Sequence, residues 1–210
     1  MSEYLIRKLT PKSTISGLSR EEFVSMADLG QAEGQLDARE SRILKNLFRF
    51  HSTLVSDIMT PGTVIFSLPA IMTVADYCDQ YADSPFSRIP IYTDQPDHMT
   101  GFVLRSDILL AEANDRHGAT LEEFQREIEA VLDQQPLSRL FSVLIEQRTH
   151  MTLVIDEYGS LEGLVTMEDL IETLLGLEIV DEEDQVTDMR KLARRLWRLR
   201  ASRMGLDLDD

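Results

Sequence analysis

The chain has 210 residues, of which 43% are hydrophobic, and its formal net charge at pH 7 is −16. This hydrophobic content is typical of a folded globular protein. The negative charge argues against general nucleic-acid binding, because basic side chains are needed to neutralise phosphates. No apolar run approaches the ~18 residues of a membrane-spanning helix, and no signal-peptide pattern opens the chain, so we expect a soluble protein. The single cysteine, Cys78, allows no intrachain disulfide and is expected in the core.

The N-terminal part contains two short amphipathic segments. We expect a linker over residues 1–18 and a helical connector over residues 19–52, because Ser19 and Asp37 each precede a glutamate by three positions, the spacing of a capping box. The first helix should end at Gly30. The apolar residues expected to face inward are Phe23, Met26 and Ala27 in the first helix and Ile43, Leu44, Leu47 and Phe48 in the second. Two such helices cannot bury these residues alone, so they should pack on the rest of the chain or on a partner.

The remainder of the chain contains one structural unit twice. The second copy has two apolar runs, Met151–Ile155 and Leu161–Val165, on either side of the turn-forming residues Asp156–Gly159, and this pattern predicts a hairpin. An amphipathic helix then begins at Thr166. The first copy lies 62 residues upstream and aligns without a gap, with Arg88–Tyr92 on His150–Val154, Gly101 on Gly163 and Asp107 on Asp169. Such a repeat determines the architecture.

Each copy is preceded by a further strand and helix. We expect them at Thr63–Ser67 and Thr73–Ala82 in the first half, and at Ala130–Leu132 and after Pro136 in the second. The predicted fold class is therefore α/β (α+β), with two pseudo-symmetric β-α-β-β-α halves. The predicted domains cover residues 53–114 and 130–180, separated by a linker helix over residues 115–129 that Thr120 caps. An acidic linker and a basic C-terminal helix should occupy residues 181–210.

Several motifs in this order resemble a known family. They are Asp57–Pro61, Phe86–Tyr92, Val154–Gly159 and Gly163–Glu172. Together they are similar to the tandem CBS domain pair, or Bateman module, of the CorC/CNNM (hemolysin-like) family, which is linked to magnesium and cobalt transport or efflux. The family's membrane proteins carry an N-terminal transmembrane domain, and residues 1–50 resemble the connector that follows it. The resemblance therefore implies a cytosolic fragment, working at the cytoplasmic face of the inner (plasma) membrane.

The resemblance also implies a nucleotide site. In the family, a threonine and an aspartate at the last strand-to-helix junction hold the ribose of an adenine nucleotide, and these roles fall on Thr166 and Asp169. A carboxylate can accept hydrogen bonds from both ribose hydroxyls, and ligands of α/β folds gather at the carboxyl ends of strands. The same spacing also suits a simple helix cap, so both roles stay open.

The phosphates of such a nucleotide need positive partners in an acidic chain. Ser87 and Arg88 resemble a family pair near the phosphates, and arginine offers a planar fork that suits phosphate. Thr60 and Pro61 lie where the family lines its cleft, although Gly62 replaces an arginine often found there. We therefore expect ATP, ADP or AMP to bind with Mg²⁺. An acid that could assist the magnesium ion is Glu168.

The first copy departs from this pattern. Leu104 occupies the position of Thr166, so the hydroxyl is missing, while Asp107 remains in a structural role and Ser106 could cap the helix. We expect one nucleotide site per chain. The four histidines (His51, His98, His117 and His150) show no metal-ligand spacing, and no catalytic nucleophile-and-base signature is present.

The resulting prediction is a regulatory module and not an enzyme: a homodimer that binds an adenine nucleotide and controls an attached membrane domain of a magnesium or cobalt transporter. The alternative is a structural CBS dimerisation module with no nucleotide ligand. Within the C-terminal segment, Arg190–Arg203 holds seven basic residues and no acids. Such a segment could lie on anionic lipid or pack on the module or across a dimer.

Overall fold

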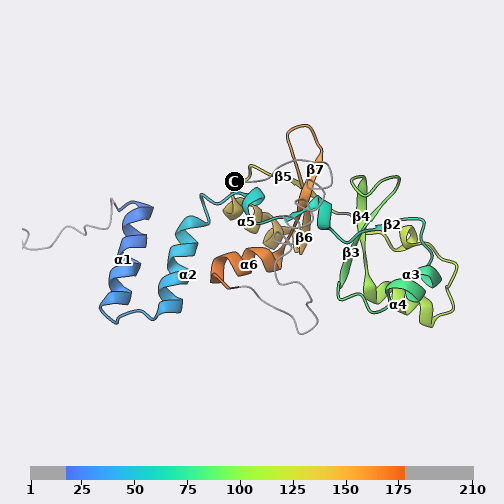
Figure 1. Cartoon of the computed structure of the whole chain (residues 1–210), viewed down its shortest axis with the longest axis horizontal. Coiled ribbons are helices and arrows are strands. Elements are labelled where there is room, and N and C mark those ends of the chain that lie inside the picture. Colours follow the sequence, from blue (N-terminus) through green and yellow to red (C-terminus); the bar gives the residue numbers. More distant parts are fainter. Residues whose placement is uncertain (1–17, 178–210) are drawn as a thin grey trace, which may run out of the picture.

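The computed structural model describes residues 18–177. A helical hairpin, α1 (Arg20–Ala32) and α2 (Ala38–Arg49), leads into two α/β halves that lie side by side (Figure 1). The expected linker over residues 1–18 therefore lies almost wholly outside the described residues, and so does the expected C-terminal part over residues 181–210. None of the helices within residues 18–177 has the length and apolar character needed to cross a membrane.

The order of elements confirms the predicted β-α-β-β-α halves. The first half consists of β2 (Leu68–Pro69), α3 (Val74–Tyr81), β3 (Arg88–Tyr92), β4 (Met99–Leu104) and α4 (Arg105–Ala113). The second consists of β5 (Ala130–Leu132), α5 (Leu137–Gln147), β6 (Met151–Ile155), β7 (Leu161–Thr166) and α6 (Met167–Leu175). The short elements between these are 3-10 turns at Val55–Asp57, Gly62–Val64 and Leu121–Phe124, and strand β1 (Thr60–Pro61).

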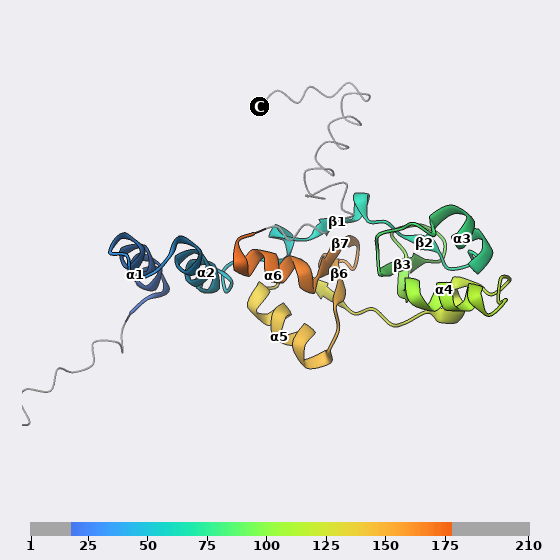
Figure 2. The same ribbon diagram turned by 90° about the horizontal axis from the view of Figure 1, so that it is seen from below.

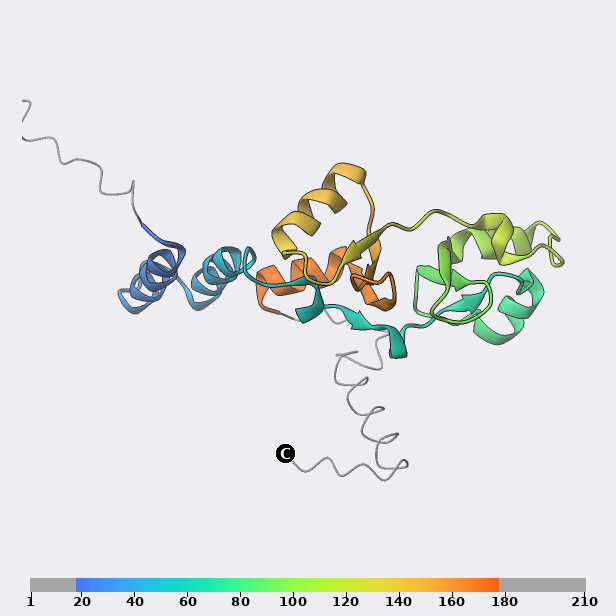
Figure 3. The ribbon, with the colours of Figure 1, turned by 90° about the horizontal axis from the view of Figure 1, so that it is seen from above.

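The two sheets exchange strands. The first sheet has the order β2-β3-β4, and the second has the order β1-β7-β6-β5. Strand β1 precedes the first half in the sequence, yet it pairs antiparallel with β7 of the second half, with Thr60 opposite Leu164. In the same way Arg126, which precedes the second half, exchanges two backbone hydrogen bonds with Phe102 of β4, at 3.0 and 2.8 Å. Figure 3 shows the two extended connections on opposite sides of the molecule.

These exchanges overturn two sequence predictions. The strand expected at Thr63–Ser67 is wrong: the chain pairs before it, in β1, and after it, in β2, and turns through Gly62–Val64 in between. The linker helix over residues 115–129 is also wrong, because only Leu121–Phe124 forms a single 3-10 turn. Thr120 is the N-cap residue of that turn, and its backbone N–H donates to Oε1 of Glu123 at 3.0 Å, but the residues that follow are held extended by the pairing with Phe102. Long-range pairing has overridden the local preference at both places, for a strand in the first and for a helix in the second.

The repeat spacing also differs slightly from the ungapped alignment. Gly101 lies opposite Ile91, and its counterpart Gly163 lies opposite Val154. Equivalent residues of β4 and β7 are thus 62 positions apart in the sequence, whereas equivalent residues of β3 and β6 are 63 apart. The reason is that the loop of the first hairpin has one more residue than the loop of the second. The structural counterpart of Arg88 is therefore Met151, not His150.

Three apolar clusters hold the halves together. One lies inside the first half and one inside the second, on the sheet faces that the helices cover. The third lies between the two sheets, where buried Met151, Leu153 and Leu164 meet partly buried residues of the first half, namely Ile65, Met99 and Phe102. The alternation along β6 and β7 explains this, because successive side chains point to opposite faces of a sheet.

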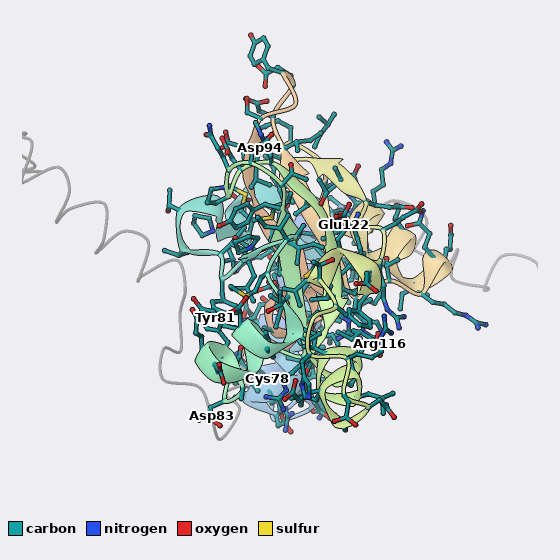
Figure 4. The ribbon with its side chains drawn as sticks, turned by 90° about the vertical axis from the view of Figure 1, so that its right-hand side faces the viewer. Cys78, Tyr81, Asp83, Asp94, Arg116 and Glu122 are labelled. Carbon is teal, nitrogen blue, oxygen red and sulfur yellow. The ribbon has the colours of Figure 1, made fainter. Side chains whose placement is uncertain are left out.

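The first half can be seen end-on in Figure 4, which labels Asp94 in the β3–β4 loop at one end and Cys78 and Tyr81 of α3 towards the other. Cys78 is partly buried against the first core, as expected, and burial raises the pKa of its thiol. In the second hairpin, Asp156 accepts hydrogen bonds from the backbone N–H groups of Ser160 and Tyr158, at 2.7 and 2.9 Å. These bonds, with that of Ser160 the largest cause, lower the pKa of the Asp156 carboxyl.

The N-terminal hairpin has both predicted capping boxes, at Ser19 and Asp37. The expected inward stripes are only partly buried: Met26 is 54% exposed and Leu47 is 48% exposed. Ala27 is buried, and α1 continues past Gly30 to Ala32. The prediction for Met26 and Leu47 is wrong: α1 packs against α2 and lies away from the two halves, and α2 meets α6 through Arg42 and Asn46 (Figure 2).

Candidate functional site

The two last strand-to-helix junctions lie on the same side of the two halves. In Figure 1 both hairpin loops point upwards, and α4 and α6 lie towards the lower side. Because β3 runs antiparallel to β4, with Arg88 opposite Leu104, the beginning of β3 lies on this lower side too. The second junction and the beginning of β3 thus face the same side of the molecule, one from each half.

The pair Thr166 and Asp169 is arranged as a helix cap. The backbone N–H and the hydroxyl of Thr166 both donate to Oδ2 of Asp169, at 2.7 and 2.8 Å, and the N–H of Asp169 lies 3.4 Å from the hydroxyl oxygen of Thr166. The capping reading is therefore confirmed. Both side chains are only partly buried, and the cap fixes the carboxylate of Asp169 at the N-terminus of α6. A carboxylate held in this way is pre-oriented for further hydrogen bonds from a diol.

Thr60 and Pro61 lie beside this pair. They form β1 and pair with Leu164 and Gly163 of β7, the strand that ends at Thr166. Thr60 lies opposite Leu164, so its side chain is on the same sheet face as that of Thr166, two positions further along β7. The approach of the two strands is close: a Cβ on Gly163 would lie 2.5 Å from the carbonyl oxygen of Thr60. The structure thus places Thr60 beside the Thr166–Asp169 pair, with Pro61 one position further along β1 and on the opposite sheet face.

Ser87 and Arg88 come from the other half. Ser87 is exposed and Arg88 is partly buried at the start of β3, and the carbonyl of Ser87 accepts from the backbone N–H of Arg105, the first residue of α4, at 3.0 Å. They belong to the first junction, not to the second. Glu168 is exposed on the first turn of α6, next to Asp169.

The first junction is built differently from the second. Leu104 is the N-cap of α4 and supplies no side-chain hydrogen bond, and the helix begins at Arg105, so Ser106 does not cap it. Asp107 instead forms an ion pair with Arg126, whose Nη2 lies 2.9 Å from Oδ2 of the aspartate. Arg126 is the structural counterpart of Thr60. Arg126 pairs with Phe102 of β4, Thr60 pairs with Leu164 of β7, and Phe102 and Leu164 are equivalent in the repeat.

Sequence reasoning missed this arginine. The signal that could have found it is the pair of glycines, Gly101 and Gly163, because each is a position where a neighbouring strand comes too close for a side chain. A Cβ on Gly101 would collide with the carbonyl oxygen of Arg126, just as one on Gly163 would collide with that of Thr60. Within residues 18–177 no cluster of three or more histidine, cysteine or acidic residues is arranged to hold a metal ion.

Comparison with known proteins fits this architecture. The CBS domain family matches residues 121–176, which include the second junction. The magnesium and cobalt efflux protein CorC of Salmonella typhimurium is 31% identical over 195 residues, which are 91% of this chain and 66% of that protein. A solved CBS domain of a bacterial CNNM/CorC family Mg²⁺ transporter has a TM-score of 0.72 and 28% identity, and the match covers 79% of this chain and 100% of that one. This chain is a tandem CBS domain pair of the CNNM/CorC family.

A second solved structure of the family bears on ligands. It is the CBS domain of the bacterial CNNM/CorC family Mg²⁺ transporter in complex with ATP, and the match covers 66% of this chain and 98% of that one, with a TM-score of 0.62 and 29% identity. The chain spans about two thirds of the CorC protein that it matches, since 66% of that protein is covered. The predicted family and fold are thus confirmed.

Proposed function

We propose that this CBS pair is a regulatory module that binds an adenine nucleotide, as Mg·ATP, at the second junction. The observation that carries this proposal is the Asp169 carboxylate, fixed by Thr166 at the N-terminus of α6 and flanked by β1. In this position the carboxylate accepts hydrogen bonds from the two ribose hydroxyls. A domain of a relative with 29% identity is known in complex with ATP.

Arg88 and Ser87 serve the phosphates in this proposal. The beginning of β3 lies on the same side of the molecule as the second junction but in the other half, so a nucleotide held by its ribose and its phosphates would bridge the two halves. The described residues 18–177 carry a strong excess of acidic side chains, and Mg²⁺ offsets the repulsion of the phosphates. Glu168 assists through water held by that ion. ADP and AMP carry fewer phosphates and gain less from Arg88.

One nucleotide binds per chain. At the first junction, Arg126 forms an ion pair with the carboxylate of Asp107, and Leu104 stands in place of the threonine. That junction therefore lacks the hydroxyl, and its carboxylate is engaged by an arginine. Titration calorimetry of the chain with Mg·ATP should give a stoichiometry near one. Absence of heat and of any melting shift with ATP, ADP and AMP would support the purely structural alternative, and a stoichiometry near two would contradict the assignment of Arg126.

The pair forms a homodimer through the helices of the two junctions. Leu109 of α4 and Ile171 of α6 are equivalent in the repeat, and both are exposed, at 39% and 36%. These two apolar side chains stand at matching positions on the last helices of the two halves, an arrangement suited to a two-fold contact. Sedimentation velocity should show a dimer for the native chain and a monomer for L109E combined with I171E. A matched control is I71E, since Ile71 is 74% exposed elsewhere, and its variant should remain dimeric.

The wider role follows the relatives. A magnesium and cobalt efflux protein is similar over most of this chain, and a solved relative is the CBS domain of a Mg²⁺ transporter. We therefore infer that the module controls an attached membrane domain of a magnesium or cobalt transporter from the cytoplasmic side. The nucleotide shifts the equilibrium between two arrangements of the module only as far as it binds one of them more tightly than the other.

A further inference from the structure

Helix α6 connects the candidate nucleotide site with the N-terminal helical hairpin. Its first turn carries Asp169, and its last turn lies against α2. We propose that α6 couples occupancy of the site to the position of the α1–α2 hairpin, through hydrogen bonds from Arg42 and Asn46 to its C-terminal carbonyls. This inference rests on the proposed function, because it concerns how binding at that site is passed on.

The contact at the end of α6 is specific. Nη1 of Arg42 donates to the carbonyl oxygen of Gly176 at 3.3 Å, and Nδ2 of Asn46 donates to that of Leu174 at 3.3 Å. The last carbonyls of a helix have no partner within the helix, and a cation is favoured there by the helix dipole. Two side chains one turn apart on α2 therefore cap α6 from outside.

The close approach at Gly176 supports this assignment. Gly176 is the C-cap of α6, with a φ of 66°, a conformation that favours glycine. A Cβ at this position would lie 2.6 Å from Cδ of Arg42 and 2.7 Å from Nδ2 of Asn46. The α2 side chains therefore pack directly on the helix end, so a shift of α6 along or about its axis must move α2 or break the contact.

Apolar packing extends the same contact towards the junction. Phe50, which ends α2, belongs to the same buried cluster as Leu170 of α6, and Leu174 packs against that cluster. Val165, the penultimate residue of β7, is also a member. Residues of β7, α6 and the end of α2 thus belong to one packed cluster between the candidate site and the helical hairpin.

The hairpin moves with α2. The Ser41 hydroxyl donates to the carbonyl of Ala27 at 3.1 Å, Lys45 forms an ion pair with Asp28 at 2.6 Å, and the rings of Phe23 and Phe48 stack with centroids 5.0 Å apart. These contacts fix α1 on α2. Figure 2 shows α2 between α1 and α6, with α1 at the end of the molecule. A displacement of α6 is therefore carried through α2 to the outermost helix.

The coupling can be measured by pulsed electron paramagnetic resonance between spin labels at S25C on α1 and S142C on α5, in a C78S background, both label sites being exposed. Mg·ATP should narrow the distance distribution of this chain. In the variant R42A combined with N46A the distribution should be broad with and without Mg·ATP, and the affinity for Mg·ATP should fall about fivefold or more, since coupling is reciprocal. The matched control is R39A, an exposed arginine on the same helix, which should behave as the parent chain.

The outcomes separate the two proposals. If calorimetry shows no binding of Mg·ATP to the parent chain, the proposed function and this inference both fail. If Mg·ATP binds but the distance distribution does not change, the proposed function stands and the inference is overturned. The inference is equally overturned if the variant lacking Arg42 and Asn46 side chains responds to Mg·ATP as the parent does.

Discussion

Replacing Asp169 with alanine should weaken Mg·ATP binding about 10- to 100-fold, because hydrogen bonds to a charged group contribute about 1.5–3 kcal/mol. The variant loses the acceptor for the ribose hydroxyls and also the cap of α6, whose loss should reduce stability by about 1 kcal/mol. Titration calorimetry measures the first effect, and thermal unfolding measures the second.

A second capping pair in the same chain separates these two effects. In α3 the hydroxyl of Thr73 donates to Oδ2 of Asp76 at 2.6 Å, and the backbone N–H of Asp76 donates back to that hydroxyl at 3.1 Å. D76A should therefore lose similar stability without any change in nucleotide affinity. D107A, at the first junction, should also bind Mg·ATP normally. If D76A weakens binding as much as D169A does, Asp169 acts on the nucleotide only through helix stability, and the assigned grip is wrong.

Replacing Gly163 with alanine should destabilise the fold by about 1–3 kcal/mol, a cost typical of added volume in a packed site. A Cβ at this position would lie 2.5 Å from the carbonyl oxygen of Thr60 and 2.9 Å from the sulfur of Met59, and the backbone oxygen cannot turn away without breaking β1. Mg·ATP affinity should fall as well, because Thr60 and Pro61 are displaced from the site. Denaturant unfolding and calorimetry measure the two quantities.

Gly118 is the matched control for this substitution. No heavy atom lies within 4 Å of a Cβ built on Gly118, and its φ is not positive, so G118A should leave stability almost unchanged. An equal melting temperature for G163A and the native chain would show that β1 can move away from β7 at little cost. The crossing strand would then contribute little to the site.

Local sequence patterns predicted the elements that are stabilised locally. The hairpin strand β6 has the expected bounds, and Asp37 and Ser19 cap the helices that they were expected to cap. Alternation, cap spacing and the repeat depend on residues close together in the chain, so a single sequence is enough to find them.

Elements that depend on distant partners could not be predicted in this way. Strand β1 has two residues and exists because β7 lies beside it, and residues after Phe124 are extended because Arg126 pairs with Phe102. The one-residue difference between the hairpin loops was hidden for the same reason, since register is set by pairing across strands.

The candidate site was predicted to a similar extent. The Thr166–Asp169 pair was found from its spacing, and its capping geometry is confirmed, while its part in nucleotide binding stays a prediction. The ion pair between Asp107 and Arg126 was missed, because it joins a helix to a connection that was expected to be helical. Asn46 and Arg42 were also missed, since nothing in α2 alone indicates that it caps another helix.

The exchange of connections between the sheets bears on how this protein loses its structure. If the chain were divided at the repeat boundary, β7 would keep an open edge without Thr60 and Pro61, and β4 would keep one without Arg126. Such bare edges invite pairing with other molecules. Neither half is therefore a self-sufficient folding unit, and the two should denature together in one cooperative step, with the repeat visible in the architecture but not in the melting curve.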